Sequence, residues 1–145
     1  MMNKTILCDL SIGSWIQIGH PAVAEIMASA GFDWLAVDLE HSAITLRDAE
    51  DLIRVIDLKG LTPLVRLSSN NGEQIKRIMD AGAHGIIVPM VKSPEEVRAA
   101  VRAVKYPPQG ERSIGLARAQ GYGADFDRYF RWQRDESLVI VQIEH

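Results

Sequence analysis

Short hydrophobic runs alternate with segments of helical period along the chain, and this alternation predicts an α/β fold with a parallel sheet. The predicted strands are 14–18, 34–39, 62–67, 85–89 and 138–143. The predicted helices are 22–30, 45–58, 72–81, 94–105 and 125–134. The last strand is an almost continuous apolar run, which is typical of a strand covered on both faces.

Local signals mark the ends of several helices. Pro21 suits the first helical turn and Gly31 the carboxyl cap of the same helix. Asn70 or Asn71 can cap the third helix, and Ser93 opens a capping box before the fourth. Residues 106–124 contain prolines and glycines without a clear period, so we expect a long loop there, of a kind that is usually functional or mobile.

The number of strand–helix units distinguishes between an open doubly wound sheet and a barrel. A (β/α)8 barrel of ~250 residues uses about 31 residues per unit, so 145 residues supply fewer than five units. No Gly-x-Gly-x-x-Gly follows the first strand and no Walker loop occurs, which removes the main support for a nucleotide-binding sheet. We therefore expect a single domain over 1–145 that is part of a TIM barrel.

The composition is that of an ordinary globular chain, with 47% hydrophobic and 24% charged residues. Lys and Arg number 16 against 19 Asp and Glu, a net charge of −3, so charge alone predicts neither nucleic-acid nor membrane binding. Cys8 is the one cysteine, which excludes an intramolecular disulfide and fits a reducing compartment. No signal peptide or long apolar stretch is present, and we expect a cytoplasmic protein.

Polar side chains stand where the predicted strands end, which in parallel α/β folds is where reactive groups gather. These residues are Asp38, Glu40, His41, Arg66, Gln142 and Glu144. Because side chains alternate along a strand, Gln142 and Glu144 are expected to share one face. Their neighbours Val141 and Ile143 are expected to face the helices.

Several motifs occur in the order and spacing of one enzyme family. They are Gly31-Phe32-Asp33-Trp34, Asp38-Leu39-Glu40-His41, Val65-Arg66, Val88-Pro89-Met90-Val91, Tyr106-Pro107-Pro108 with Gly110, and Val141-Gln142-Ile143-Glu144. From about Gly13 to Glu144 the chain resembles the HpcH/HpaI aldolases, the metal-dependent class II pyruvate aldolases. The resemblance implies a (β/α)8 barrel of the phosphoenolpyruvate/pyruvate type, truncated here after about strand 5. It also implies cleavage of 4-hydroxy-2-oxo acids, many of them derived from sugar acids, to pyruvate and an aldehyde.

The resemblance also implies roles for individual residues. Glu144 matches a metal ligand, with Mg²⁺ or Mn²⁺ expected and Co²⁺ also accepted by such sites. Arg66 matches the arginine that binds the 2-oxo group and stabilises the enolate. His41 matches the acid–base histidine, and Asp38 is expected to orient its ring. Gln142 is expected near the substrate.

Other interpretations remain open at this point. The family's second metal-ligand aspartate follows strand 6, so one alternative is a non-catalytic or incomplete half-barrel that needs a partner chain or an oligomer. Family members are commonly hexamers, and a homo-oligomer is expected in any case. A second alternative is a citrate-lyase-type barrel that acts on coenzyme A thioesters. Arg118 is a candidate for contacting the far end of the substrate, whereas His20, His84, His145, Trp15, Trp34 and Met90 are assigned to packing or surface roles.

Overall fold

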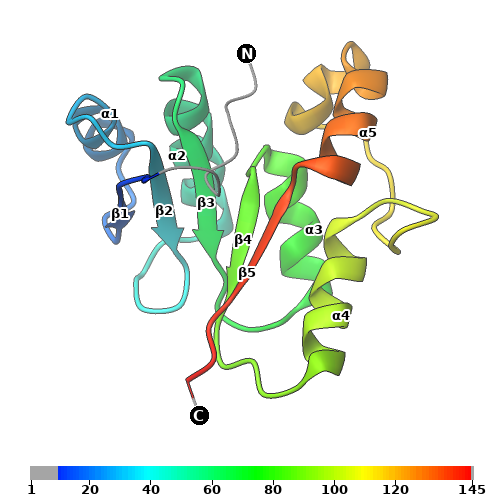
Figure 1. Cartoon of the computed structure of the whole chain (residues 1–145). Coiled ribbons are helices and arrows are strands. Elements are labelled where there is room, and N and C mark those ends of the chain that lie inside the picture. The colour runs from blue at the N-terminus through cyan, green and yellow to red at the C-terminus, as the bar shows by residue number, and fades with distance from the viewer. Residues whose placement is uncertain (1–9, 145) are drawn as a thin grey trace.

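The computed structural model describes residues 10–144 and contains one parallel five-stranded sheet in the order β1-β2-β3-β4-β5 (Figure 1). The strands are β1 (Gly13–Ile16), β2 (Trp34–Asp38), β3 (Thr62–Arg66), β4 (Gly85–Val88) and β5 (Leu138–Val141). The helices are α1 (Pro21–Ala28), α2 (Leu46–Leu58), α3 (Gly72–Ala81), α4 (Pro94–Val104), the 3₁₀ helix η1 (Arg118–Gly123) and α5 (Phe126–Asp135). The predicted α/β class and strand order are confirmed.

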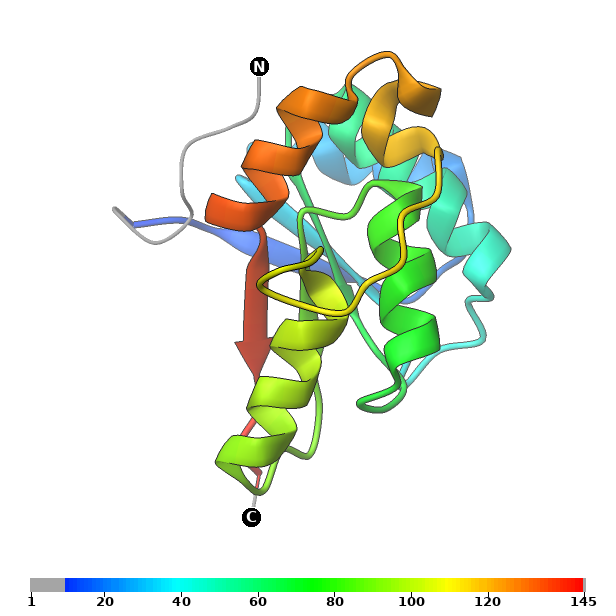
Figure 2. The same cartoon turned by 90° about the vertical axis from the view of Figure 1, so that its right-hand side faces the viewer.

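The main core lies between the sheet and the helices along one of its faces, as Figure 2 shows for α3 and α4. Helix α2 turns one apolar side to this core, and its buried residues are Ala49, Leu52, Ile53 and Ile56. On the other face of the sheet a smaller buried cluster consists of Ala36, Leu64 and Ile87. Because successive side chains along each strand point to opposite faces, the sheet separates a thick apolar layer from a thin one.

Most predicted helix starts are confirmed by their caps. Asn71 Oδ1 accepts from the backbone N–H groups of Glu73 and Gln74, both at 2.9 Å. Ser93 Oγ accepts from Glu96 N at 3.3 Å, but the Glu96 carboxylate bonds to Lys92 N and not to Ser93 N. The capping box predicted at Ser93 is therefore only half formed.

Two expectations were wrong, one about the carboxyl cap of helix α1 and one about the burial of strand β5. The carboxyl cap of helix α1 is Ser29 and not Gly31. Gly31 lies in the turn that follows and adopts a φ of 86°, a conformation that favours glycine. Strand β5 is not covered on both faces, since every residue from Leu138 to Val141 is partly exposed. The reason is topological, because within residues 10–144 β5 lies at the edge of the sheet and has one neighbouring strand.

The segment 106–124 is packed in place by a buried arginine. Arg112 is 2% exposed, and its guanidinium lies 4.2 Å from the centre of the Tyr106 ring. Its Nη2 donates to Tyr129 Oη at 2.9 Å, and Gln120 Nε2 donates to Tyr106 Oη. The expected loop thus contains η1 and a polar core of its own.

No helix in the part of the chain that the structure describes is long and apolar enough to cross a membrane. Cys8 and His145, discussed above from the sequence, lie outside the described residues.

Candidate active site

An ion pair joins the ends of two neighbouring strands at the carboxyl edge of the sheet. The register of β2 and β3 places Asp38 beside Arg66. Arg66 Nε donates to Asp38 Oδ1 at 2.9 Å, and Arg66 Nη2 donates to Asp38 Oδ2 at 2.6 Å. This bidentate geometry fixes the plane of the guanidinium as well as its position.

The Asp38 carboxylate is fully buried and saturated with donors. Besides Arg66, Gln17 Nε2 donates to Oδ2 at 2.7 Å. The backbone N–H groups of Glu40 and His41 donate to Oδ1 at 3.0 and 3.2 Å. Burial alone would raise the pKa of Asp38, but these hydrogen bonds outweigh it and hold that pKa well below its usual range. Asp38 is therefore an anion that anchors Arg66.

Arg66 is the cation around which the other charged groups gather. Its hydrogen bonds to Asp38 raise its pKa, with smaller contributions from the charges of Asp38, Glu40 and Glu144. Its side chain is 14% exposed, and nitrogen Nη1 has no hydrogen-bond partner among residues 10–144. In the described part of the chain, one donor group of a fixed arginine is thus left without a partner at this edge.

His41 and Glu40 follow directly on β2. The His41 side chain is 68% exposed, and its Nε2 lies 3.7 Å from Glu40 Oε2. The same Glu40 oxygen lies 3.5 Å from Arg66 Nε and is buried without a hydrogen-bond partner among the described residues. The structure does not agree with the expectation that Asp38 orients the ring of His41. The Asp38 carboxylate accepts from the backbone N–H of His41 and from the Arg66 guanidinium.

Glu144 and Gln142 extend the same edge beyond β5. Glu144 Oε2 accepts from Met90 N at 3.0 Å, and Met90 has a φ of 56°, unusual for a residue with a side chain. The Gln142 backbone N–H donates to the Val88 carbonyl at 2.9 Å, while its side-chain Oε1 is buried and unpaired. Val141 packs against the helix-side core as expected.

Divalent cations such as Mg²⁺ and Mn²⁺ prefer several oxygen ligands. Glu144 offers a carboxylate, and the buried Gln142 Oε1 is an oxygen acceptor without a donor. Within residues 10–144, however, no group of three His, Cys, Asp or Glu side chains is placed to hold a metal. These residues therefore fit one side of a coordination shell and leave the remaining ligands to other groups.

Two contributors to this edge, Trp15 and Gln17, were not identified from the sequence as functional. The Arg66 guanidinium lies 4.6 Å from the centre of the Trp15 ring, and Gln17 bonds to Asp38 as described. Their signal was the alternation along the first strand, which places both on the face that also carries Asp38 and Arg66.

Other candidate residues lie elsewhere. Arg118 donates to Asp57 Oδ2 at 2.5 Å and to the Ala81 carbonyl at 3.3 Å, so it is held near the amino-terminal end of β4, at the edge opposite Arg66. The expectation that Arg118 contacts the substrate is therefore wrong for this arrangement. His84 lies 3.5 Å from the Asp57 carboxylate at that same end, in agreement with its structural assignment.

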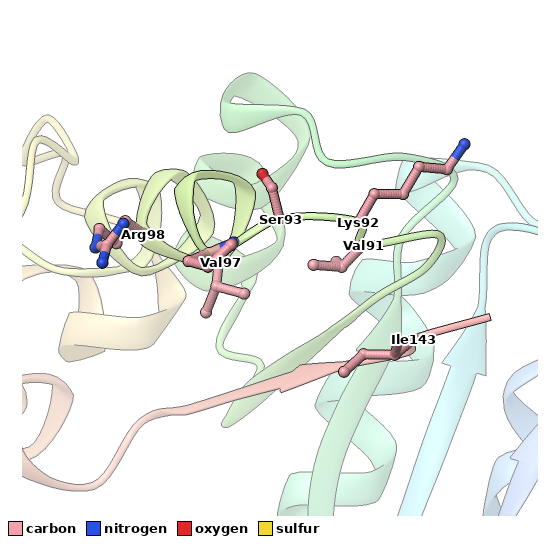
Figure 3. A pocket seen from close by; sticks show the side chains of 7 residues that line it. Val91, Lys92, Ser93, Val97, Arg98 and Ile143 are labelled. Carbon is pink, nitrogen blue, oxygen red and sulfur yellow. The ribbon is translucent and has the colours of Figure 1, made fainter. Parts of the chain in front are cut away.

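An apolar groove of about 460 Å³ lies beside the polar edge, on the helix side of β5 (Figure 3). Val91, Val97 and Ile143 point toward it, with Lys92 and Arg98 at its margins. Ile143 lines this groove together with Val97 of α4, which confirms the prediction that it faces the helix side. Its side chain is nevertheless 76% exposed. The groove and the charged site are on opposite faces of the same segment.

Comparison with known proteins gives one consistent result. Residues 11–145 match the family described as HpcH/HpaI aldolase/citrate lyase. The chain is 40% identical over 134 residues to hydroxypyruvate/pyruvate aldolase of Sagittula stellata, covering 92% of this chain and 53% of that protein. It is 40% identical to 4-hydroxy-2-oxo-heptane-1,7-dioate aldolase of Escherichia coli, covering 92% of this chain and 51% of that protein.

A solved structure agrees with these relatives. The crystal structure of an HpcH/HpaI aldolase/citrate lyase family protein from Burkholderia cenocepacia superposes with a TM-score of 0.85 and 32% identity. The match covers 92% of this chain and 55% of that one. The chain thus spans about half the length of the relatives that it matches.

Proposed function

The chain belongs to the HpcH/HpaI aldolase/citrate lyase family, and on this premise we propose that it acts as a metal-dependent class II pyruvate aldolase. The substrate class is 4-hydroxy-2-oxo acids, including those derived from sugar acids, and the products are pyruvate and an aldehyde. The two relatives above are named for aldolase reactions, one of them on a 4-hydroxy-2-oxo diacid.

The reaction needs a base and a site for negative charge. A base removes the proton of the 4-hydroxyl group, the bond between C3 and C4 breaks, and its electron pair passes to the oxygen on C2. The aldehyde leaves, and the resulting pyruvate enolate takes a proton at C3 to become pyruvate. Preorganised cationic donors at the position of the C2 oxygen lower the barrier of such a step most effectively.

The observation that carries the proposal is the Arg66–Asp38 pair at the carboxyl edge of the sheet. Two nitrogens of Arg66 are held by the carboxylate, and Nη1, which has no hydrogen-bond partner within residues 10–144, can donate to an oxyanion. Because Asp38 stays ionised, Arg66 cannot swing away without leaving a buried negative charge unpaired. We assign to Arg66 the stabilisation of the enolate oxygen, with Gln142 nearby on the substrate side.

His41 is the base in this proposal. Its imidazole is exposed at the same edge, and histidine is the side chain that most often serves as a general base. Asp38 supports it by positioning the backbone of residues 40 and 41.

We assign Glu144 as a ligand of Mg²⁺ or Mn²⁺, with Co²⁺ a further option. When bound, the cation supplies Lewis-acid attraction for the 2-oxo acid. The second oxygen of the Glu144 carboxylate and Gln142 Oε1, neither of which has a hydrogen-bond partner within residues 10–144, are the ligand atoms that favour this assignment.

The test is release of pyruvate from 2-dehydro-3-deoxyglucarate by the purified chain, with Mn²⁺ and then with excess chelator. Turnover is expected to fall by at least ~100-fold in Arg66→Ala and in His41→Ala, as for loss of an oxyanion donor or a general base. Arg98→Ala is the matched control, since the exposed Arg98 pairs with Glu95 on α4 and makes no hydrogen bond or ion pair with Asp38, Arg66 or His41 among residues 10–144. Absence of turnover with Mn²⁺ would overturn the proposal that this chain by itself is an enzyme.

One observation favours a second candidate, a half-barrel that is active only with a complementing chain or in an oligomer. Within residues 10–144 no group of three His, Cys, Asp or Glu side chains is placed to hold a metal, and the relatives are about twice as long. This candidate predicts millimolar binding of Mn²⁺ that Glu144→Gln barely changes, whereas the first predicts a stoichiometric site that the same substitution abolishes. A homo-oligomer and a cytoplasmic location stay predictions from the sequence.

A further inference from the structure

Two residues on and directly after the edge strand β1 contact the charged pair formed between β2 and β3. Trp15 and Gln17 are two residues apart and therefore point to the same face. The Trp15 ring lies against the Arg66 guanidinium, 4.6 Å from ring centre to Cζ. Gln17 Nε2 donates to the Asp38 oxygen that also binds Arg66 Nη2. Both contacts thus converge on one ion pair.

These contacts restrict the two motions that the bidentate pair leaves open. A guanidinium bound along one edge to a carboxylate can still tilt out of the carboxylate plane, and an aromatic ring against its face opposes that tilt. A carboxylate can still rotate about its Cβ–Cγ bond, and a second donor on Oδ2 opposes that rotation. Trp15 acts on the first motion and Gln17 on the second.

The electrostatic character of Gln17 and Trp15 also suits them to holding the Arg66–Asp38 pair. Gln17 is a neutral donor, so it satisfies Asp38 without competing with Arg66 for the negative charge. Trp15 covers one face of the guanidinium, and a less hydrated cation interacts more strongly with nearby anions. Trp15 is itself 41% exposed, so its surface is not required for the apolar core.

We propose that Trp15 and Gln17 are positioning residues, which hold Arg66 and Asp38 so that Nη1 of Arg66 keeps a fixed orientation at the carboxyl edge. The catalytic consequence rests on the proposed aldolase function, but the positioning itself does not. The experiment separates the two.

The direct measurement is exchange with water of the Arg66 Nε–H proton, followed by NMR on the full chain labelled at arginine and assigned with Arg66→Lys. Trp15→Leu and Gln17→Met are each expected to speed this exchange by ~10-fold, the effect of one lost contact to a charged group. Trp15→Phe is expected to stay close to wild type, because an aromatic face is retained. The controls Tyr122→Leu and Gln109→Met change exposed side chains of the same kinds in the segment 106–124.

Unchanged exchange in both Trp15→Leu and Gln17→Met would overturn the proposal, and so would equal acceleration in Trp15→Leu and Trp15→Phe. The pyruvate assay then gives the catalytic side, where the two variants are expected to lower kcat by ~10-fold with little change in KM. If exchange accelerates as expected and the wild-type chain shows no turnover, the positioning role stands and the aldolase proposal for this chain fails.

Discussion

Asp38 illustrates how one buried residue can set the character of a site. Its carboxylate is fully buried and yet ionised, because donors from the residue after β1, from β3 and from its own loop surround it. The same contacts that hold Arg66 in place therefore make the local structure sensitive to pH. Function and stability depend here on the same side chain.

The pH dependence of stability can be worked out for this residue. The folded pKa of Asp38 is lower than the unfolded value of about 3.9, so its contribution is complete above that value. It is lost as the pH falls from about 4 toward the lower folded pKa. Asp38→Asn is expected to lower the free energy of unfolding by on the order of 3 kcal/mol at pH 7 and to reduce its change between pH 5 and pH 3.

Urea unfolding at a series of pH values measures this effect. Asp127→Asn is the matched control, because Asp127 is an exposed residue of α5. A wild-type curve and an Asp38→Asn curve that run parallel down to pH 3 would contradict the assigned role.

At the scale of the element, the cap at the start of helix α2 contributes to stability. Helix α2 begins with Thr45, whose Oγ1 accepts from Asp48 N at 3.2 Å, while the Asp48 carboxylate accepts from Thr45 N at 2.9 Å. Helix α2 supplies much of the helix-side core beneath the strand that carries Asp38. The cap of this helix therefore contributes to the stability of the layer behind the site.

Thr45→Ala is expected to lower the free energy of unfolding by about 1 kcal/mol, because one backbone N–H of the first turn loses its partner. Ser113→Ala, at an exposed position of the segment 106–124, is the control and is expected to have little effect. Equal midpoints for Thr45→Ala and wild type in urea would show that the cap contributes nothing measurable.

At the scale of the whole molecule, the five-stranded sheet formed by the described residues has two unpaired edges. Within residues 10–144, strand β5 has a neighbour on one side only, and the exposed Ile143 lines the groove beside it. Near the other edge Ile12 and Ile18 are 57% and 63% exposed. Unpaired strand edges and exposed apolar patches favour association between chains.

We therefore expect the chain to self-associate as its concentration rises, as measured by sedimentation velocity. Ile143→Lys is expected to shift the distribution toward the monomer, because it places a charge in the groove beside β5. Leu58→Lys is the control, since Leu58 is 77% exposed at the end of α2, a helix that packs against β2 and β3 (Figure 1). A monomer at every concentration for the wild-type chain would contradict this prediction.

The sequence by itself was sufficient for the order of strands and helices, for most helix caps and for the residue types at the carboxyl edge. These features depend on near neighbours along the chain, because strand and helix periodicity and capping involve residues only a few positions apart. The family motifs likewise identified Arg66, His41 and Glu144 as candidates before any geometry was available.

Only the tertiary structure decided which of these residues contact each other. Arg66 and Asp38 are 28 positions apart and Gln17 and Asp38 are 21 apart, so their pairing depends on the register of neighbouring strands. That register assigned Asp38 to Arg66 instead of to the His41 ring, and it brought Trp15 and Gln17 to the site. It also left β5 as an exposed edge strand, although its apolar sequence is typical of a buried one. Hydrophobic composition shows what a segment can bury, whereas the neighbours present in the fold determine what is actually buried.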